Sequence, residues 1–131
     1  MQPIALEVQA FGPFARRQRL EFDALREHGL YLISGPTGSG KSTLLDAITF
    51  ALYGESSGKE RSAEEMRSDH AAADLETRVT FDFQLGERAW RVTRTPRWER
   101  PRRRGGGTTT VAAGAALHAL VLEGAHWTQG E

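Results

Sequence analysis

The sequence predicts an α/β fold in which one helix packs against a mixed sheet that has an antiparallel portion. Three observations support this prediction. An apolar run at residues 30–33 leads through a glycine-rich loop into a helical pattern at residues 41–52. Residues 77–85 and 89–95 alternate between apolar and polar side chains across a short turn, which is typical of a β-hairpin. Residues 4–11 alternate with the same period, so they predict a half-buried strand.

Composition restricts the classes of protein that the chain can belong to. With 131 residues it is one domain or part of one, and its 17 basic residues balance 17 acidic ones, so only local clusters can attract nucleic acid. The absence of cysteine excludes a disulfide framework and a cysteine metal site. The start of the chain does not resemble a signal peptide, and no apolar run is long enough for a membrane span. We therefore expect a cytoplasmic protein without membrane contact.

The sequence predicts three strands before the glycine loop. Gly12 and Pro13 end the strand at residues 4–11, and a second short strand at residues 19–22 would pair with it like a hairpin. The apolar run continues to Ser34 and predicts a strand at residues 30–34 that is buried on both faces.

The predicted helix at residues 41–52 has one apolar face, formed by Leu44, Leu45, Ile48, Ala51 and Leu52. Gly54 is placed to end this helix in the left-handed conformation.

The polar stretch after the helix carries weaker signals. Residues 56–59 read as a mobile loop, and residues 63–66 fit one helical turn.

The last part of the chain is again rich in strands. After the hairpin, Pro96 and Pro101 break the next strand, and a basic, glycine-rich stretch follows. Residues 117–123 predict a strand, and residues 124–127 turn toward another. No closing element follows, so we expect residues 1–131 to be one incomplete domain.

The glycine loop has the features of a phosphate-binding site. Residues 35–42 match the G-x-x-x-x-G-K-[ST] spacing between a strand and a helix, where backbone N–H groups and the helix N-terminus can surround an anion. Lys41 would reach the β- and γ-phosphates, and the Ser42 hydroxyl would ligate Mg²⁺. The alternative is a glycine-rich turn with a solvated lysine. The candidate binding residues are Gly35, Pro36, Thr37, Gly38, Ser39, Gly40, Lys41 and Ser42.

Hydrolysis of a triphosphate requires more than this loop. A carboxylate at the end of a later buried strand must hold Mg²⁺, and no such strand follows Lys41 in the sequence. Asp82 lies in an alternating hairpin strand, which predicts a place on the solvent face rather than a metal-binding role. We therefore expect no catalytic residue in this chain.

A second candidate site is the run of arginines from Arg88 to Arg104, which begins in the second hairpin strand and continues beyond it. Clustered arginines beside Trp90 and Trp98 can bind the phosphates of nucleic acid. The alternative is a solvated hairpin tip that pairs with acidic residues elsewhere. The candidate DNA-binding residues are Arg100, Arg102, Arg103 and Arg104.

Several sequence blocks together resemble one known family. Residues 11–14, 33–42 and 46–55 are similar to the N-terminus of SbcC, within the SMC-like ABC ATPases. Residues 66–70 and 99–110 are similar to later signatures of that family.

The resemblance implies the N-terminal lobe of an ABC-type ATPase head, without its coiled coil and C-terminal lobe. By the same resemblance, residues 38–43, which add Thr43 to the candidate site, would hold ATP and Mg²⁺, and residues 12–16 would lie near the base and ribose. The implied partners are the SbcD nuclease, the C-terminal lobe of the same protein, a second SbcC head and double-stranded DNA. The implied activity is ATP hydrolysis that regulates DNA-end processing, with the fragment alone inactive.

Other assignments remain open at this point. Another SMC-like or RecF-type repair ATPase would lack the arginine, proline and glycine block at residues 100–107. A self-contained P-loop kinase or GTPase would need motifs that the sequence does not contain. A nucleic-acid-binding module with a vestigial nucleotide site would bind DNA without any effect of ATP.

Overall fold

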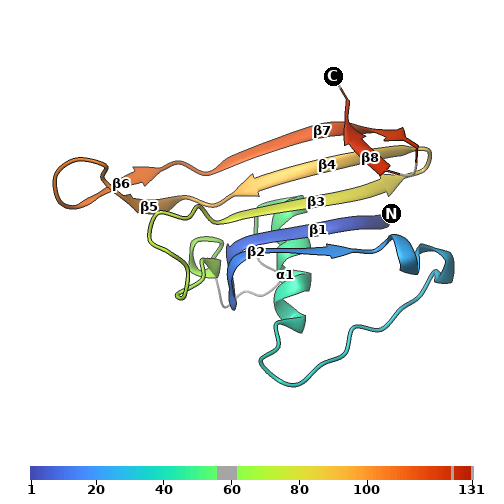
Figure 1. Cartoon of the computed structure of the whole chain (residues 1–131), viewed down its shortest axis with the longest axis horizontal. Helices are drawn as coiled ribbons and strands as arrows, with labels where there is room; N and C mark the ends of the chain where they lie inside the picture. The colour runs from blue at the N-terminus through green and yellow to red at the C-terminus, as the bar shows by residue number, and fades with distance from the viewer. Residues whose placement is uncertain (56–61, 125, 131) are drawn as a thin grey trace.

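In a computed structural model, which describes residues 1–55, 62–124 and 126–130, an antiparallel sheet carries a helix on one face (Figure 1). The strand order in the described part is β2-β1-β3-β4-β7-β8, and β5 and β6 form a separate two-stranded sheet. The strands are β1 (Gln2–Phe11), β2 (Phe14–Glu21), β3 (Arg78–Leu85), β4 (Arg88–Thr95), β5 (Trp98–Pro101), β6 (Thr108–Val111), β7 (Gly114–Glu123) and β8 (His126–Gln129). The helices are α1 (Lys41–Tyr53) and the short 3₁₀ turns η1 (Asp23–His28) and η2 (Glu64–Met66).

The two predicted hairpins lie side by side in the sheet, with β1 next to β3. β1 pairs with β2, and β3 pairs with β4 so that Phe81 lies opposite Val92 and Phe83 opposite Trp90. Leu6 of β1 lies opposite Phe81. Because alternate residues of a strand face the same side, these apolar side chains form one continuous surface for the helix. The alternation in the sequence is thus confirmed.

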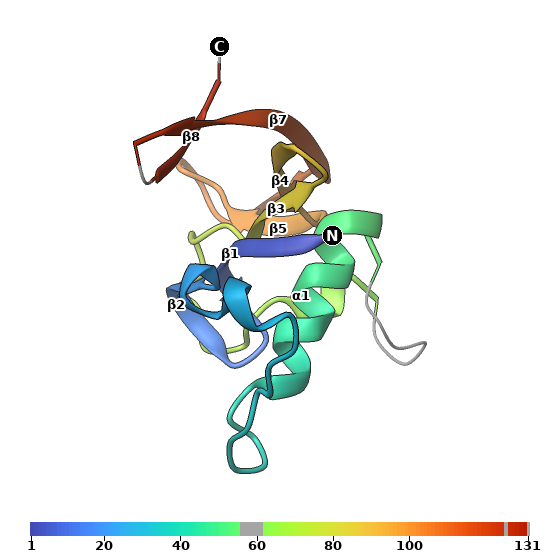
Figure 2. The same ribbon diagram turned by 90° about the vertical axis from the view of Figure 1, so that its right-hand side faces the viewer.

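Helix α1 covers this surface, as Figure 2 shows from the side. Its buried residues are Ala47, Phe50 and Ala51, and the Phe50 ring stacks on Phe11 with 6.0 Å between the centroids. The predicted apolar face was wrong in part, because Leu45 is 60% exposed. Gly54 ends the helix as predicted, with φ at 80° and its N–H donating to the Phe50 carbonyl.

The predicted strand at residues 30–34 was wrong. These residues form no strand, and Leu30 and Leu32 are 86% and 88% exposed. A strand that is buried on both faces needs hydrogen-bonded neighbours, and no described residue pairs with this segment. The expected parallel component of the sheet is therefore missing: every strand pairing in the described residues is antiparallel.

The polar and β-rich later parts of the chain largely follow the predictions. The helical turn expected at residues 63–66 appears as η2, while the loop expected at residues 56–59 lies outside the described residues. The strand at residues 117–123 lies within β7, which pairs with β4, and β8 follows it. Within the described ranges, none of the helices is long and apolar enough to cross a membrane.

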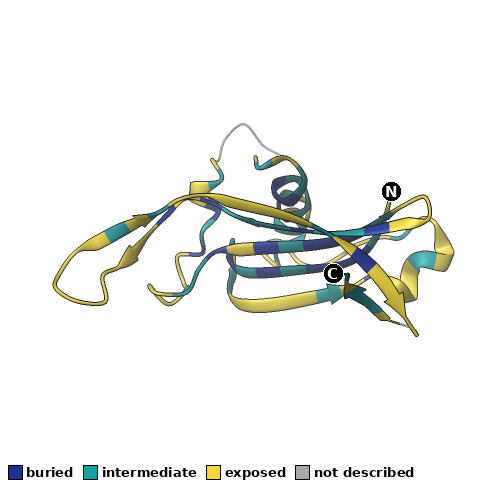
Figure 3. Cartoon of the chain, turned by 90° about the horizontal axis from the view of Figure 1, so that it is seen from above, coloured by how far each residue is buried: buried dark blue, intermediate teal, exposed yellow. Residues whose placement is uncertain are grey.

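The basic stretch forms a hairpin that the sequence did not predict. β5 pairs with β6, and the hairpin projects beyond one end of the main sheet (Figure 1). Glu99 fixes its register, because the carboxylate accepts hydrogen bonds from Thr110 Oγ1 at 2.5 Å and Thr108 Oγ1 at 3.1 Å. Figure 3 shows this hairpin as largely exposed, in contrast to the buried central strands.

The sheet face opposite α1 carries a buried ion pair. Asp82 is 2% exposed and accepts two hydrogen bonds of 2.7 Å from Arg91, one on each carboxylate oxygen. The predicted solvent exposure of Asp82 was therefore wrong, because the side chains of Arg91 on β4 and Arg19 on β2 lie within 4.0 Å of its carboxylate. Asp82 raises the pKa of Arg91, mainly through the hydrogen bonds between the two side chains. Both carboxylate oxygens thus accept a hydrogen bond from Arg91.

Candidate nucleotide-binding site

The glycine loop leads directly into the N-terminus of α1. The helix begins at Lys41, and Gly38 and Gly40 have φ values of 86° and 96°. Glycine occupies this left-handed region without the steric cost that other residues meet. At the first turn of an α-helix the N–H groups lack intrahelical partners and attract anions. The loop and the helix N-terminus therefore have a backbone geometry in which N–H groups can surround an anion.

A cavity of about 610 Å³ lies beside this helix end. One side of it is formed by six of the predicted residues, and Gly12 and Pro13 adjoin them. The six are Thr37, Gly38, Gly40, Lys41, Ser42 and Thr43. The cavity is large enough for a nucleotide-sized ligand. Three predicted residues, Gly35, Pro36 and Ser39, are not among those that line it.

Gly35 and Ser39 shape the loop. A Cβ atom at Gly35 would lie 2.8 Å from Ser39 Oγ, so a side chain there would displace the loop. Lys41 Nζ donates a hydrogen bond to the Gly35 carbonyl, which places the ammonium group against the loop. A phosphate in the cavity would offer this ammonium group a negatively charged acceptor in place of the carbonyl.

The corner between β1 and β2 packs tightly on the loop. A Cβ at Gly12 would lie 2.5 Å from Thr43 Cγ2, and a Cβ at Gly40 would lie 2.8 Å from Phe14 Cζ. Ala10, just before this corner, has φ at 50° at a β-bulge. Its carbonyl accepts hydrogen bonds from Ser68 N and Thr77 Oγ1 at 2.9 and 3.0 Å. This strained residue therefore turns Gly12 toward the cavity.

The opposite wall of the cavity was not predicted as part of the site. It is formed by Glu65, Arg67, Asp69 and His70. The sequence singled out the last three only through the family resemblance at residues 66–70, and it did not single out Glu65. Arg67 holds this wall in place by donating hydrogen bonds to the carbonyl oxygens of Leu75 and Ala72 at 2.5 and 2.9 Å. Burial lowers the pKa of Arg67, and a guanidinium group stays charged in proteins.

The residues present fit a nucleotide with Mg²⁺. Ser42 lines the cavity and offers a hydroxyl ligand, and the carboxylates of Glu65 and Asp69 line it as well. The described residues contain no group of three or more His, Cys, Asp or Glu that would hold a metal by itself. Mg²⁺ commonly keeps water ligands and binds through few protein groups together with phosphate oxygens. This donor set therefore suits a metal that arrives with the nucleotide.

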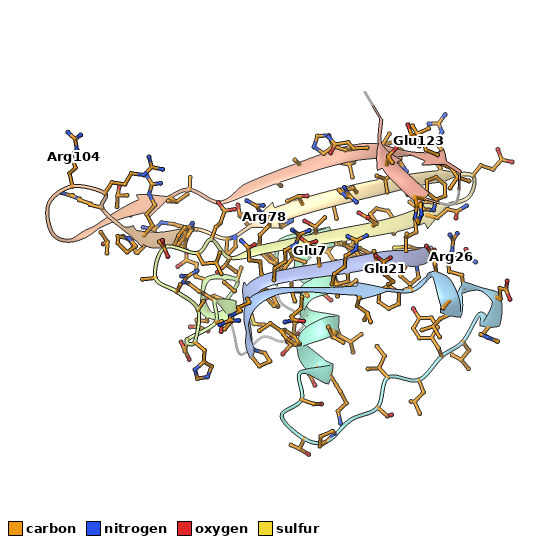
Figure 4. All side chains as sticks on the ribbon, in the orientation of Figure 1. Glu7, Glu21, Arg26, Arg78, Arg104 and Glu123 are labelled. Atoms are coloured by element: carbon orange, nitrogen blue, oxygen red, sulfur yellow. The ribbon has the colours of Figure 1, made fainter. Side chains whose placement is uncertain are left out.

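The predicted DNA-binding arginines lie on the β5–β6 hairpin. Arg100 belongs to β5, and Arg102, Arg103 and Arg104 lie in the exposed connection to β6. Arg102 holds the turn, since its Nε donates to the Thr108 carbonyl at 3.0 Å. Figure 4 shows Arg104 pointing outward at the tip of the hairpin. The side chains at the tip are thus placed for contact with an external anion.

Comparison with known proteins identifies the family. The family described as "AAA domain" matches residues 5–118, which include the glycine loop, α1 and most of the sheet. The chain belongs to this AAA domain family. The match covers the central hairpins and both walls of the cavity.

Three relatives of this AAA domain are named as the SbcC component of the SbcCD nuclease. The protein of this name from Vibrio cholerae is 47% identical over 124 residues, which cover 95% of this chain and 12% of that relative. Those from Lactococcus lactis and Staphylococcus aureus JH9 are 46% and 40% identical, over 80% and 72% of this chain and 10% and 9% of their own lengths. The chain thus spans about a tenth of the relatives it matches, and the resemblance to SbcC is confirmed.

Proposed function

We propose that residues 1–131 are the N-terminal, ATP-binding lobe of an SbcC protein, and that ATP binding in the full protein regulates DNA-end and hairpin processing by an SbcD nuclease. The observation that carries this proposal is the cavity between the glycine loop and residues 65–70. It joins a helix N-terminus, a lysine and a hydroxyl group, which together suit a triphosphate with Mg²⁺.

The roles of the site residues follow from their chemistry. Backbone N–H groups at residues 38–43 would bind the phosphates, Lys41 would neutralise the β- and γ-phosphates, and Ser42 would ligate Mg²⁺. Residues 12–16 would lie toward the base and ribose. Hydrolysis would require groups from the C-terminal lobe of the same protein and from a second SbcC head, so this chain alone would not turn over ATP. Double-stranded DNA would meet the arginines of the β5–β6 hairpin.

One experiment tests the division of the ATPase site. ATP turnover is measured for this chain alone and for its mixture with a separately expressed C-terminal lobe, with and without linear DNA. We expect turnover only in the mixture and its loss with Lys41→Ala. Turnover by the chain alone would contradict the proposal, because it would require a complete enzyme within these residues.

A second measurement tests the assembly. In the full-length protein, Lys41→Ala should abolish nucleotide-driven association of two heads, because the γ-phosphate would lose its cationic partner. Analytical ultracentrifugation with and without ATP would show this. Heads that still associate in the variant would contradict the role given to Lys41.

A further inference from the structure

One short segment lies between the two candidate sites. Glu65, Arg67 and Asp69 line the nucleotide cavity, and the same three side chains also line a second cavity of about 480 Å³ beneath the basic hairpin. The hairpin side of this second cavity includes Glu99 and Pro101 of β5. Residues 64–70, which we call the shared wall, therefore separate the nucleotide site from the arginine hairpin by the thickness of one chain segment.

Arg67 connects the shared wall to the hairpin. Its guanidinium carbon lies 4.6 Å from the centre of the Trp98 ring, within the range of a cation–π contact. Trp98 is the first residue of β5 and is 7% exposed. The guanidinium N–H groups donate to the chain around residues 72–77, including Thr77 Oγ1 at 3.0 Å. One side chain thus fixes the wall, the following loop and the base of the hairpin.

Two further features concern the same junction. Arg97 lies 3.8 Å from Glu64, which adds an exposed ion pair between the hairpin base and the wall. Trp98 Nε1 is buried and finds no hydrogen-bond partner among the described residues. An unsatisfied buried N–H group is unfavourable, so a small shift of Trp98 that supplies an acceptor would be favourable. The junction therefore holds an unsatisfied donor next to the contact between the hairpin and the shared wall.

We infer that Arg67 is a positioning residue that couples nucleotide binding to DNA binding through its contact with Trp98, within a single chain. The inference rests on the proposed function, because it assigns a link between the two sites named there. A nucleotide in the cavity would restrain the shared wall and with it Arg67. The hairpin would then lose less conformational freedom when its arginines bind DNA phosphates, so ATP raises DNA affinity.

The test measures linkage rather than activity. The dissociation constant of a blunt DNA duplex is measured for this chain with and without Mg²⁺-ATP, and that of ATP with and without the duplex. Linkage requires the same ratio in both directions, and we expect about fivefold or more, the lower end of measured couplings. Hydrogen exchange at residues 98–111 should slow when ATP alone is added.

Variants of the contact separate positioning from folding. Trp98→Leu removes the ring face and should reduce the ratio to about one, whereas Trp98→Phe keeps an aromatic face and should retain part of it. Arg67→Lys keeps the charge but loses the guanidinium's several directed hydrogen bonds, so it should lower the ratio as well. Arg88→Ala, at the far end of β4, is the matched control and should leave the ratio unchanged. A merely structural contact would change the melting temperature without changing this ratio.

The outcomes are distinguishable. If the chain binds neither ATP nor DNA, the proposed function and the inference both fail. If it binds both with a ratio of one, the inference alone is overturned. A ratio above one that survives in Trp98→Leu would also overturn it, because the coupling would then run elsewhere.

Discussion

Gly12 and Thr43 are in such close contact that a single added methyl group would separate them. A Cβ at Gly12 would stand 2.5 Å from Thr43 Cγ2, and Gly12 has φ at 55°. This contact joins the corner between β1 and β2 to the first turn of α1. A substitution that pushes Gly12 and Thr43 apart should therefore change the nucleotide cavity directly, because both residues line it.

Gly12→Ala should destabilise the protein and weaken ATP binding, because it combines backbone strain with a clash. Gly86→Ala is the matched control, since Gly86 has φ at 60° but no atom within 4 Å of an added Cβ. We expect the control to cost about 1 kcal/mol, and Gly12→Ala at least about 1 kcal/mol more. Urea unfolding and ATP titration would measure both effects. Equal costs for the two variants would show that the loop yields to the new methyl group.

Ala10→Gly should leave stability almost unchanged, although Ala10 is fully buried. Relief of the left-handed strain, about 1–2 kcal/mol, would offset the lost methyl burial and the added chain entropy. Ala5→Gly on the same strand is the control. Ala5 is 1% exposed and has no positive φ, so its substitution should cost about 1.5 kcal/mol. If thermal unfolding gave the same loss for both variants, the strain at Ala10 would be negligible.

Asp82→Ala should destabilise the sheet by about 3 kcal/mol, because it leaves the partly buried Arg91 without its bidentate partner. The double variant Asp82→Leu with Arg91→Leu should lose less, since neither charge then stays buried. Denaturant unfolding of both proteins would decide this. A double variant that is less stable than Asp82→Ala would mean that the pair contributes more than mutual neutralisation.

The combined change Arg103→Ala with Arg104→Ala should weaken DNA binding and lower the slope of log K against log salt by ~1.8, without loss of stability. Arg102→Ala should also loosen the hairpin, because its Nε holds the Thr108 carbonyl. Fluorescence anisotropy at several salt concentrations would measure the slopes. Reversal of all three arginines to glutamate should flatten the slope further. An unchanged slope would mean that the hairpin contacts protein rather than DNA.

The β5–β6 hairpin should lose order in acid. Hydrogen bonds from Thr110 and then Thr108 hold the pKa of the Glu99 carboxyl below its ordinary value of 4.5. A depressed pKa in the folded state gives stability that is present above pH 4.5 and is lost as the pH falls through the folded-state value. An NMR titration of Glu99 would follow this, with Thr110→Val as the comparison. The pKa should rise in the variant, and the same pKa in both proteins would exclude the hydrogen bond as the cause.

The sequence predicts those parts of the fold whose cause is local. Strand alternation places Phe81 and Phe83 on one face, and the structure has them there. The glycine loop likewise predicts a helix that begins at Lys41, as the structure has it. Periodicity cannot supply a partner strand, which is why the apolar run at residues 30–34 led to a wrong prediction.

Contacts between distant segments were not predictable from local patterns. The bulge at Ala10 depends on hydrogen bonds from Ser68 and Thr77, which lie far along the chain. The wall around Arg67 joins the cavity for the same reason. The burial of Asp82 depends on Arg91 of β4 and Arg19 of β2, whereas alternation alone predicts a position facing water.

The sheet order has a consequence for how the chain folds. β1 and β3 are neighbours, yet the glycine loop, α1 and η2 all lie between them in sequence. The hairpins β1–β2 and β3–β4 can form within microseconds, whereas their union must close this long connection and should be slower. The joining of the two hairpins brings Gly12 to Met66. The Gly12 N–H then donates to the Met66 carbonyl at 2.7 Å. The nucleotide cavity, which Gly12 and residues 65–70 line together, therefore cannot form before the two hairpins have joined.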